Sequence, residues 1–293
     1  MVAGGDRTRR NGVFWEVLSF VRKDRVARVS ALVVSLVFVC ALVAPLLPRI
    51  GLPNPYEMNL RLQVAPPSSQ HLLGTDSFGR DLLSRIVFGA RVSVTIGFVA
   101  VGIASIIGLT LGLLCGYYRG HIDQVIMRIM DAFLALPPIL LALTLVGFLG
   151  PGARNVMIAL GIVYTPRLTR VIRAKVISVR YSDYVQAARA IGAGEFRILF
   201  RHIFPNSFGT YVVQSTVSYA YAIIAEAGMS FLGLGTQPPT SSWGLILSEA
   251  RPYIKEAPWF ILFPGIAISV SVLAITLLGD RLREAIDPKQ RAG

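Results

Sequence analysis

Long apolar runs separated by polar stretches constrain the fold of this sequence more than any other feature. A helix needs about 20 mostly apolar residues to cross the ~30 Å hydrocarbon core of a bilayer. The chain is 54% apolar and 15% charged, whereas soluble domains average about 45–50% and about 25%. The sequence therefore predicts an all-α polytopic membrane protein with six transmembrane helices, at about residues 30–47, 92–117, 125–148, 155–172, 208–232 and 259–278.

Basic residues are distributed unevenly between these predicted spans. The formal net charge is +13, and most lysines and arginines lie in residues 1–28, around the second-to-third and fourth-to-fifth connections, and in the C-terminal tail. Cytoplasmic loops of membrane proteins carry this excess, so both termini are predicted to be cytoplasmic. Nucleic-acid binding is disfavoured because the charges lie between apolar spans and not on one compact domain.

Motifs of enzyme chemistry are absent from the sequence. No lysine follows a glycine, so there is no phosphate-binding G-x-x-x-x-G-K-[ST] loop, and neither H-E-x-x-H nor G-x-S-x-G occurs. Cys40 and Cys115 both lie in apolar spans and are interpreted as buried small residues, not as a disulfide or a metal site. The sequence thus predicts no enzyme, no cofactor and no metal in this chain, and any ATP chemistry must belong to another polypeptide.

One polar stretch, residues 181–206, interrupts the apolar pattern. It predicts a short helix over 183–191, a flexible Gly192-Ala193-Gly194 connection, and a second helix over 195–204 that ends before Pro205. The second helix would place an apolar row on one side, at spacings of three and four residues. That row comprises Phe196, Leu199, Phe200 and Ile203.

This stretch resembles the cytoplasmic coupling loop of ABC-importer permeases. Gln186-Ala187-Ala188, Gly192 and Pro205 match the spacing of that loop, although the family usually has glutamate where Gln186 stands. The resemblance, together with the apolar row, predicts contact with ATPase subunits. The expected ATPase-coupling residues are Gln186, Ala187, Ala188, Gly192, Phe196, Leu199, Phe200, Ile203 and Pro205.

Three further blocks resemble the C-type subunit of the dipeptide/oligopeptide (nickel) branch of these permeases. They are Leu73-Gly74-Thr75-Asp76 with Gly79-Arg80-Asp81 and Gly89-Ala90-Arg91, then Phe231-Leu232-Gly233-Leu234-Gly235 with Pro238-Pro239 and Ser242-Trp243-Gly244, and Leu277-Leu278-Gly279-Asp280-Arg281.

The resemblance implies a type I ABC-importer permease fold in the bacterial plasma (inner) membrane. It also implies that this chain pairs with a B-type permease subunit, two ABC ATPase subunits that hold ATP and Mg, and an extracytoplasmic substrate-binding protein. The implied substrate is a short peptide. Nickel, another metal chelate or another small solute is an alternative within the branch, and an ion-coupled secondary transporter is a less favoured one, since it would need carboxylates at the membrane midplane.

A few residues outside the coupling stretch are candidates for transport roles. Glu226 lies in an apolar run, where a carboxylate is costly and suggests a pathway or gate residue, although capping of local backbone or pairing with an outer arginine would also explain it. Pro137-Pro138 must break the third span and is a second pathway or gate candidate. Arg128 and Asp131 are spaced for a helix-surface pair. Asp76, Arg80 and Trp243 are candidates for contact with the binding protein or the partner permease.

The sequence divides into four predicted parts. Residues 1–28 form a cytoplasmic basic tail, and 29–91 form the first transmembrane helix with an extracytoplasmic loop. Residues 92–279 form a core of five transmembrane helices that contains the coupling loop 181–206, and 280–293 form a second cytoplasmic tail.

Overall fold

The fold is entirely helical within the described residues of a computed structural model, 22–286, apart from an isolated β-bridge between Thr75 and Asp81. Most of the predicted N-terminal tail and half of the predicted C-terminal tail lie outside these residues. The helices are α2 (Arg25–Val43), α3 (Leu82–Tyr118), α4 (Gly120–Leu134), α5 (Pro138–Leu149), α6 (Ala153–Arg180), α7 (Asp183–Ala190), α8 (Glu195–Arg197), α9 (Phe204–Phe231), α10 (Trp243–Ala250) and α11 (Pro258–Ile286). Short 3₁₀ turns η1 (Ala44–Ile50), η2 (Leu60–Leu62) and η4 (Arg251–Tyr253) and a π-helical turn η3 (Ile198–Ile203) connect them.

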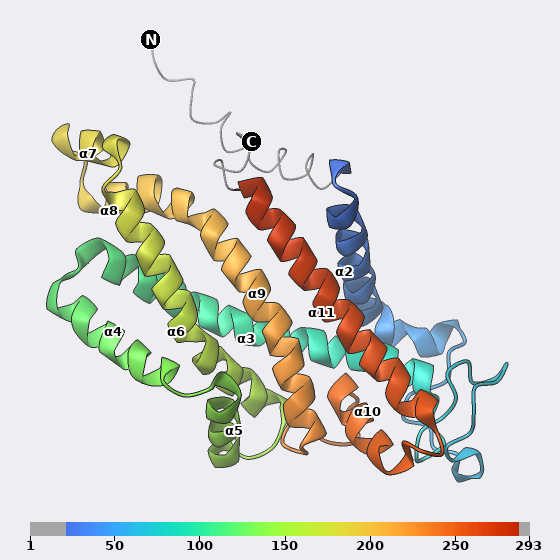
Figure 1. Cartoon of the computed structure of the whole chain (residues 1–293). Coiled ribbons are helices and arrows are strands. Elements are labelled where there is room, and N and C mark those ends of the chain that lie inside the picture. Colours follow the sequence, from blue (N-terminus) through green and yellow to red (C-terminus); the bar gives the residue numbers. More distant parts are fainter. Residues whose placement is uncertain (1–21, 287–293) are drawn as a thin grey trace.

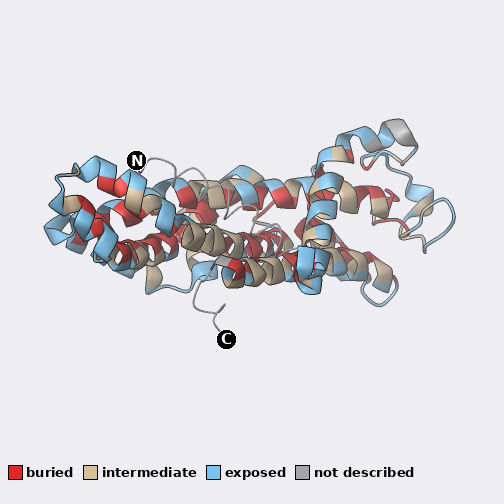
Figure 2. Cartoon of the chain, turned by 90° about the horizontal axis from the view of Figure 1, so that it is seen from above, coloured by how far each residue is buried: buried red, intermediate tan, exposed pale blue. Residues whose placement is uncertain are grey.

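The long helices α2, α11, α9 and α6 run side by side, and α3 crosses behind them (Figure 1). The start of α2, the end of α11 and the short helices α7 and α8 lie at one end of the molecule. Helix α10 and the segment before α3 lie at the opposite end. Seen from above, buried residues line the faces between the helices, and exposed residues occupy the outer faces (Figure 2). The chain therefore has two distinct ends joined by a bundle.

Three helical segments are long and apolar enough to cross a membrane, namely Arg25–Leu46, Leu82–Tyr118 and Pro258–Ala285. A fourth crossing is possible if α4 and α5 are counted as one broken span. Helices α6 and α9, which correspond to the predicted fourth and fifth spans, are not among these three segments. Both are long enough, with 28 residues each, but their composition is too polar for this criterion. Membrane-spanning helices are thus present, but this criterion gives three or four and not the predicted six.

The predicted third span is not a single helix. Its two halves, α4 and α5, are bent by 91° at a break just before Pro138. A proline has no N–H to donate and its ring clashes with the preceding turn, so the predicted break at Pro137-Pro138 is confirmed. Arg128 does not pair with Asp131 as the spacing suggested, because Asp131 forms an ion pair with Arg170 of α6 instead.

Close packing of α3 against α6 depends on three glycines at four-residue intervals. A Cβ atom at Gly108, Gly112 or Gly116 would lie 3.1, 2.8 or 2.7 Å from the Cβ atom of Leu168, Ile172 or Val176, respectively. Small residues let membrane helices approach closely, and these three glycines do so for α3 and α6. A Cβ atom at Gly102, in contrast, would have no neighbouring atom within 4 Å, so this glycine makes no such contact.

The second predicted span also begins earlier than expected. Asp81 caps α3 by accepting a hydrogen bond from the Ser84 N–H at 2.7 Å, so the helix is continuous from Leu82. The predicted boundary between residues 91 and 92 consequently falls inside α3. Cys115 is buried and Cys40 half-buried, and both are free thiols.

Candidate coupling surface and outer polar clusters

The polar stretch 181–206 forms a helix-turn-helix at the end of the bundle. Helix α7 ends at Ala190, and Gly192 then adopts a φ of +83°, a conformation that glycine takes without steric cost. Ser182 precedes α7 as its N-cap residue but makes no capping bond with its side chain. The Gln186 amide donates to the Arg180 carbonyl at 2.9 Å. The predicted hinge at Gly192 is therefore present, and Gln186 is tied to the end of α6.

The second predicted helix does not end at Pro205. Helix α8 continues through the π-helical turn η3 directly into α9, and Pro205 lies in the first turn of α9. Within η3 the Phe204 N–H donates to the Leu199 carbonyl, five residues back. This wider turn lets the helix pass the residue that cannot donate, so the predicted termination at Pro205 is wrong.

The predicted apolar row is divided between two faces. Leu199 and Ile203 are 4% and 0% exposed and pack against α6, whereas Phe196 and Phe200 are 74% and 48% exposed. The rings of Phe196 and Phe200 lie 4.4 Å apart between centroids. The expectation of one exposed face is thus wrong for Leu199 and Ile203. Two exposed residues that the sequence reasoning missed join the phenylalanines in what we call the coupling patch: Tyr184, Ile191, Phe196 and Phe200.

The remaining predicted coupling residues differ in accessibility. Gln186, Ala187, Gly192 and Pro205 are exposed, and Ala188 lies on the buried face of α7. No contact with another subunit tests any of them, so their role in ATPase coupling stays a prediction.

Aromatic and cationic side chains fix this helix-turn-helix to the bundle. The Arg180 guanidinium lies over the rings of Tyr117 and Tyr181, 5.5 and 5.9 Å from their centroids. Arg119, between α3 and α4, donates to the Tyr181 hydroxyl at 3.0 Å. Such cation–π contacts favour a defined arrangement, so the coupling patch is held against the ends of α3 and α6.

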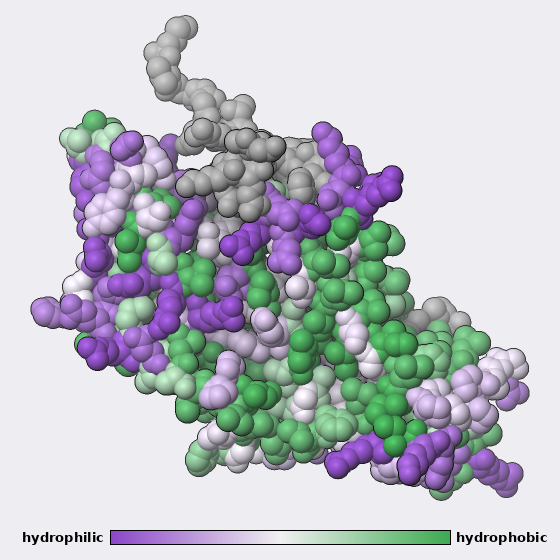
Figure 3. All heavy atoms as spheres, in the orientation of Figure 1, coloured by the Kyte–Doolittle hydropathy of each residue, from purple (hydrophilic) through white to green (hydrophobic). Residues whose placement is uncertain are grey.

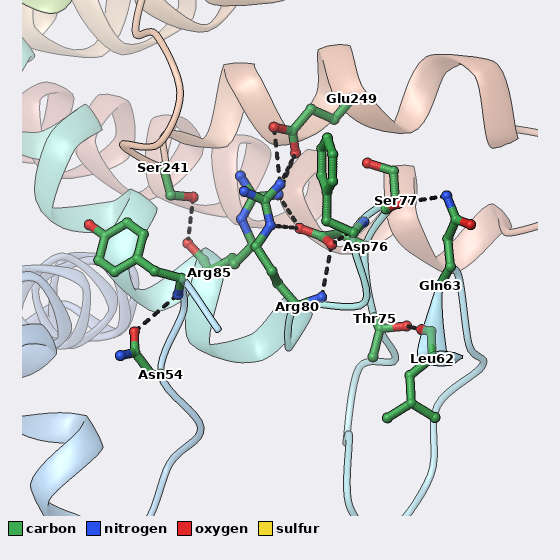
Figure 4. A network of polar contacts seen from close by, with 12 residues as sticks. Asn54, Leu62, Gln63, Thr75, Asp76, Ser77, Arg80, Arg85, Ser241 and Glu249 are labelled. Carbon is green, nitrogen blue, oxygen red and sulfur yellow. Dashed lines mark hydrogen bonds and ion pairs between the residues drawn. The ribbon is translucent and has the colours of Figure 1, made fainter. Parts of the chain in front are cut away.

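At the opposite end, four charged side chains form a buried network (Figure 4). Arg80 Nε and Arg85 Nη1 each lie 2.5 Å from Asp76 Oδ2. Arg80 Nη2 also lies 3.1 Å from Glu249 Oε2, and Arg85 pairs with the same carboxylate. Buried charges persist when they are paired and hydrogen-bonded. The network therefore joins the segment before α3 to α10.

Asp76, Arg80 and Trp243 do not form the exposed partner surface that the sequence suggested. Asp76 and Arg80 are buried in the charge network, and Trp243 is 2% exposed. The Trp243 indole N–H donates to the Ile86 carbonyl of α3 at 2.9 Å. These three side chains therefore hold parts of this chain together, which corrects the expectation that they face a partner.

Glu226 is fully buried and surrounded by hydroxyl groups. It accepts hydrogen bonds from Ser93 of α3 at 3.0 Å and from Ser230 at 2.7 Å, and Thr236 lies at 3.5 Å. Among the described residues no arginine pairs with it, so the alternative of an outer arginine partner is wrong. We call these four residues the Glu226 cluster. Sequence reasoning missed the hydroxyl partners, because they come from different elements.

The loop after α9 lies very close to the Glu226 cluster. A Cβ atom at Gly235 would lie 2.0 Å from Ser230 Oγ, and one at Gly244 would lie 2.5 Å from the Ala227 carbonyl oxygen. The Thr236 N–H also donates to Ser230 Oγ at 3.0 Å. Only glycine allows this approach, so the loop is fixed on the end of α9.

The other pathway candidates, Pro137 and Pro138, are exposed at the break between α4 and α5. Exposed, unpaired backbone at such a break needs protein or water to cover it within a membrane. No group of three or more metal-ligating side chains occurs between residues 22 and 286.

Comparison with known proteins connects these features to a family. Residues 108–292 match the binding-protein-dependent transport system inner membrane component family. The chain is 44% identical over 277 residues to the dipeptide transport system permease protein DppC of Alkalihalophilus pseudofirmus, covering 94% of this chain and 90% of the relative. It is likewise 44% identical over 282 residues to the di/tripeptide transport system permease protein DppC of Pseudomonas aeruginosa, covering 94% and 91%.

A third relative and a solved structure extend the comparison. The glutathione transport system permease protein GsiD of Escherichia coli is 44% identical over 269 residues, covering 92% of this chain and 88% of the relative. A chain of the MetNI methionine ABC transporter in an inward-facing conformation aligns with a TM-score of 0.61 at 19% identity, covering 70% of this chain and 98% of that chain. The fold is thus that of an ABC-importer permease.

Proposed function

The chain belongs to the family of binding-protein-dependent transport system inner membrane components, and from this premise we propose that it is a permease subunit of an ATP-driven importer of short peptides. The observation that carries the proposal is the 44% identity over 94% of the chain to dipeptide and di/tripeptide permeases. This permease performs no covalent chemistry of its own. It forms half of a pathway that other subunits open and close.

The coupling patch would dock onto the ATPase subunits. An exposed apolar patch on a membrane protein's polar end usually marks a partner surface, and Phe196 and Phe200 supply two adjacent aromatic rings for it. We assign Gln186, Ala187, Gly192 and Pro205 to the rim of this contact, and Ala188, Leu199 and Ile203 to the support behind it. ATP and Mg would be bound by those ATPase subunits.

The two ends of the bundle suggest a topology in the bacterial plasma membrane. With the coupling patch in the cytoplasm, the start of α2 and the end of α11 are cytoplasmic as well, because all three lie at one end (Figure 1). Helix α10 and the charge network then face outward. We propose six crossings, formed by α2, α3, the broken α4–α5 pair, α6, α9 and α11. The divisions at residues 28 and 279 are kept, and the division at residue 91 moves to the start of α3 at Leu82.

Two further partners complete the proposed assembly. A B-type permease subunit would form the other half of the pathway, and an extracytoplasmic binding protein would deliver peptide to the end that carries α10. Hydrophobic side chains cover α2 and α11 on the face seen in Figure 3, which is the surface expected to face lipid or the second permease.

Transport would follow from rigid movement of the coupling end. When the ATPases close, α7 and α8 shift, and the glycine-packed pair α3 and α6 moves with them as one body. Glu226 would then act at the outer gate, because its hydroxyl partners join α3, α9 and the outer loop. Pro137 and Pro138 would give α4 and α5 separate orientations along the pathway.

Reconstitution of the complete importer tests this function. The chain would be purified with its second permease and ATPases, placed in liposomes, and supplied with the binding protein and radiolabelled dialanine. We expect uptake that requires ATP and is inhibited by vanadate. Uptake of nickel but not dialanine would favour the alternative substrate, and uptake that an ion gradient drives without ATP would reject the proposal.

A further inference from the structure

Helices α4 and α6 border a cavity, open on one side, that none of the roles above uses. Its volume is about 250 Å³, somewhat below the ~300–1,000 Å³ of sites for drug-sized ligands. The lining is almost entirely polar or charged and carries both signs. It comprises Asp123, Gln124, Met127, Arg128, Asp131 and Arg173.

Two ion pairs between α4 and α6 fix the walls of this cavity. Asp123 is buried and accepts from Arg173 Nε at 2.6 Å and from Nη2 at 2.7 Å. Such bidentate pairs are geometrically specific. Asp131 pairs with Arg170 further along the two helices. The spacing between α4 and α6 is therefore set by these contacts and does not depend on a bound molecule.

The cavity lining contains two arginines, and Arg128 is the one that can bind a ligand anion, because Arg173 is paired with Asp123. Arg128 is exposed, and no ion pair or hydrogen bond for it is found among residues 22–286. Three residues on, Asp131 lines the same cavity, and the Cβ atoms of such helix neighbours are ~5–6 Å apart. A carboxylate has about four acceptor positions, so Asp131 can accept another donor while it is paired with Arg170.

The polar edge of α4 is suited to an aqueous path. On the other edge of the helix, Ile122, Val125 and Ile129 are exposed and apolar. Hydrophilic side chains gather over α4 and the adjoining part of α6 in Figure 3. Polar side chains of membrane helices face a protein interior or a water-filled cavity and not lipid. Water is thus the expected medium at Arg128.

The cavity also lies near the coupling end. Arg173 precedes Tyr181 by eight residues of α6 and its end, which is about 12 Å along a helix axis at 1.5 Å per residue. A molecule leaving the pathway toward the coupling end would pass this position.

We propose that the cavity between α4 and α6 is an exit site for short peptides, which binds the peptide carboxylate at Arg128 and the peptide ammonium at Asp131. The ends of an extended dipeptide are about 7 Å apart, and a long arginine side chain and an aspartate three residues apart on one helix face can reach both ends together. No side-chain pocket is needed, so peptides of different sequence bind alike. This inference rests on the proposed function and adds the substrate contact within this subunit.

Photocrosslinking in the complete importer tests the contact directly. The photoreactive residue p-benzoylphenylalanine replaces Gln124 in the cavity or, as a matched control, Ile122 on the opposite edge of α4. The importer in nanodiscs is illuminated with radiolabelled dialanine, binding protein and ATP. We expect labelled permease from the Gln124 position and background labelling from the Ile122 position.

Substitution of Arg128 provides the second readout. In Arg128→Gln the peptide carboxylate loses its hydrogen bond to a charged group, which should lower kcat/KM for dialanine uptake about tenfold or more. Arg128→Lys keeps the positive charge and should retain most of the uptake rate. Arg154→Gln, an exposed arginine at the far end of α6, should transport like wild type.

Equal labelling at the two positions, or wild-type uptake by Arg128→Gln, would overturn the exit site while leaving the proposed function intact. A crosslink from Gln124 to another subunit would overturn it too, because the cavity would then be a subunit contact. If the unmodified importer takes up no dialanine under any condition, the proposed function itself fails, and the exit site with it.

Discussion

Replacing Asp76 with asparagine should release the segment before α3 from α10. The carboxylate is fully buried, and two guanidiniums lie 2.5 Å from one of its oxygens. Its other oxygen accepts from the N–H groups of Phe78 at 2.8 Å and Arg80 at 2.9 Å. Asparagine retains some hydrogen bonding but leaves two buried cations to share Glu249 alone.

The expected cost follows from the loss of one partner in a buried network. Removing one member of a buried ion pair destabilises by about 3–5 kcal/mol. At RT of about 0.59 kcal/mol, opening of the segment becomes more frequent by about two to nearly four orders of magnitude. The change is local, because the network joins only the segment before α3, the start of α3, and α10.

Hydrogen exchange followed by mass spectrometry measures this opening. In Asp76→Asn, peptides covering residues 59–81 should lose protection by the factor above, while peptides from α6 keep theirs. Asp131→Asn is the control, because its ion pair with Arg170 is about half exposed and exposed pairs contribute only ~0–1 kcal/mol. Unchanged protection of residues 59–81 in Asp76→Asn would refute the reasoning that this network holds the segment.

Three other substitutions test the coupling patch, the helix packing and the outer cluster. Phe200→Asp should abolish peptide uptake and co-purification of the ATPases. Leu72→Asp, at an exposed position at the opposite end of the bundle, should do neither. Normal co-purification of the ATPases with Phe200→Asp would count against the coupling patch. Gly112→Val should destabilise the purified subunit by about 1–3 kcal/mol through overpacking, seen as a lower Tm, and Gly102→Val should leave the Tm unchanged; equal Tm values would contradict the packing argument. Glu226→Gln should slow uptake without loss of ATPase subunits, and uptake equal to wild type would remove Glu226 from the gate.

The sequence predicted features that depend on local backbone chemistry. Pro137 and Pro138 lack N–H donors, so a break in the third span could be predicted, and Gly192 could be expected at a positive φ in the turn after α7. Neither of these features needs information from distant residues.

Features that depend on distant residues were not predictable in the same way. Phe196 and Leu199 fall on one face of a regular α-helix, but the π-helical turn winds more residues per turn and separates them. The partner of Arg80 in the outer network is Glu249, 169 residues further on, so burial of Arg80 left no local signal. Arg85, inside an otherwise apolar stretch, was the available clue to that network.

The uninterrupted passage from α8 into α9 gives the molecule a single stiff rod. Phe200 and Glu226 lie on it 26 positions apart, which is about 39 Å at 1.5 Å per residue. A tilt of only one degree about its Phe200 end moves the Glu226 carboxylate sideways by roughly 0.7 Å on this geometry. Through this length, a small movement imposed on Phe200 by another subunit would strain the hydrogen bonds that Ser93, Ser230 and Thr236 make with Glu226.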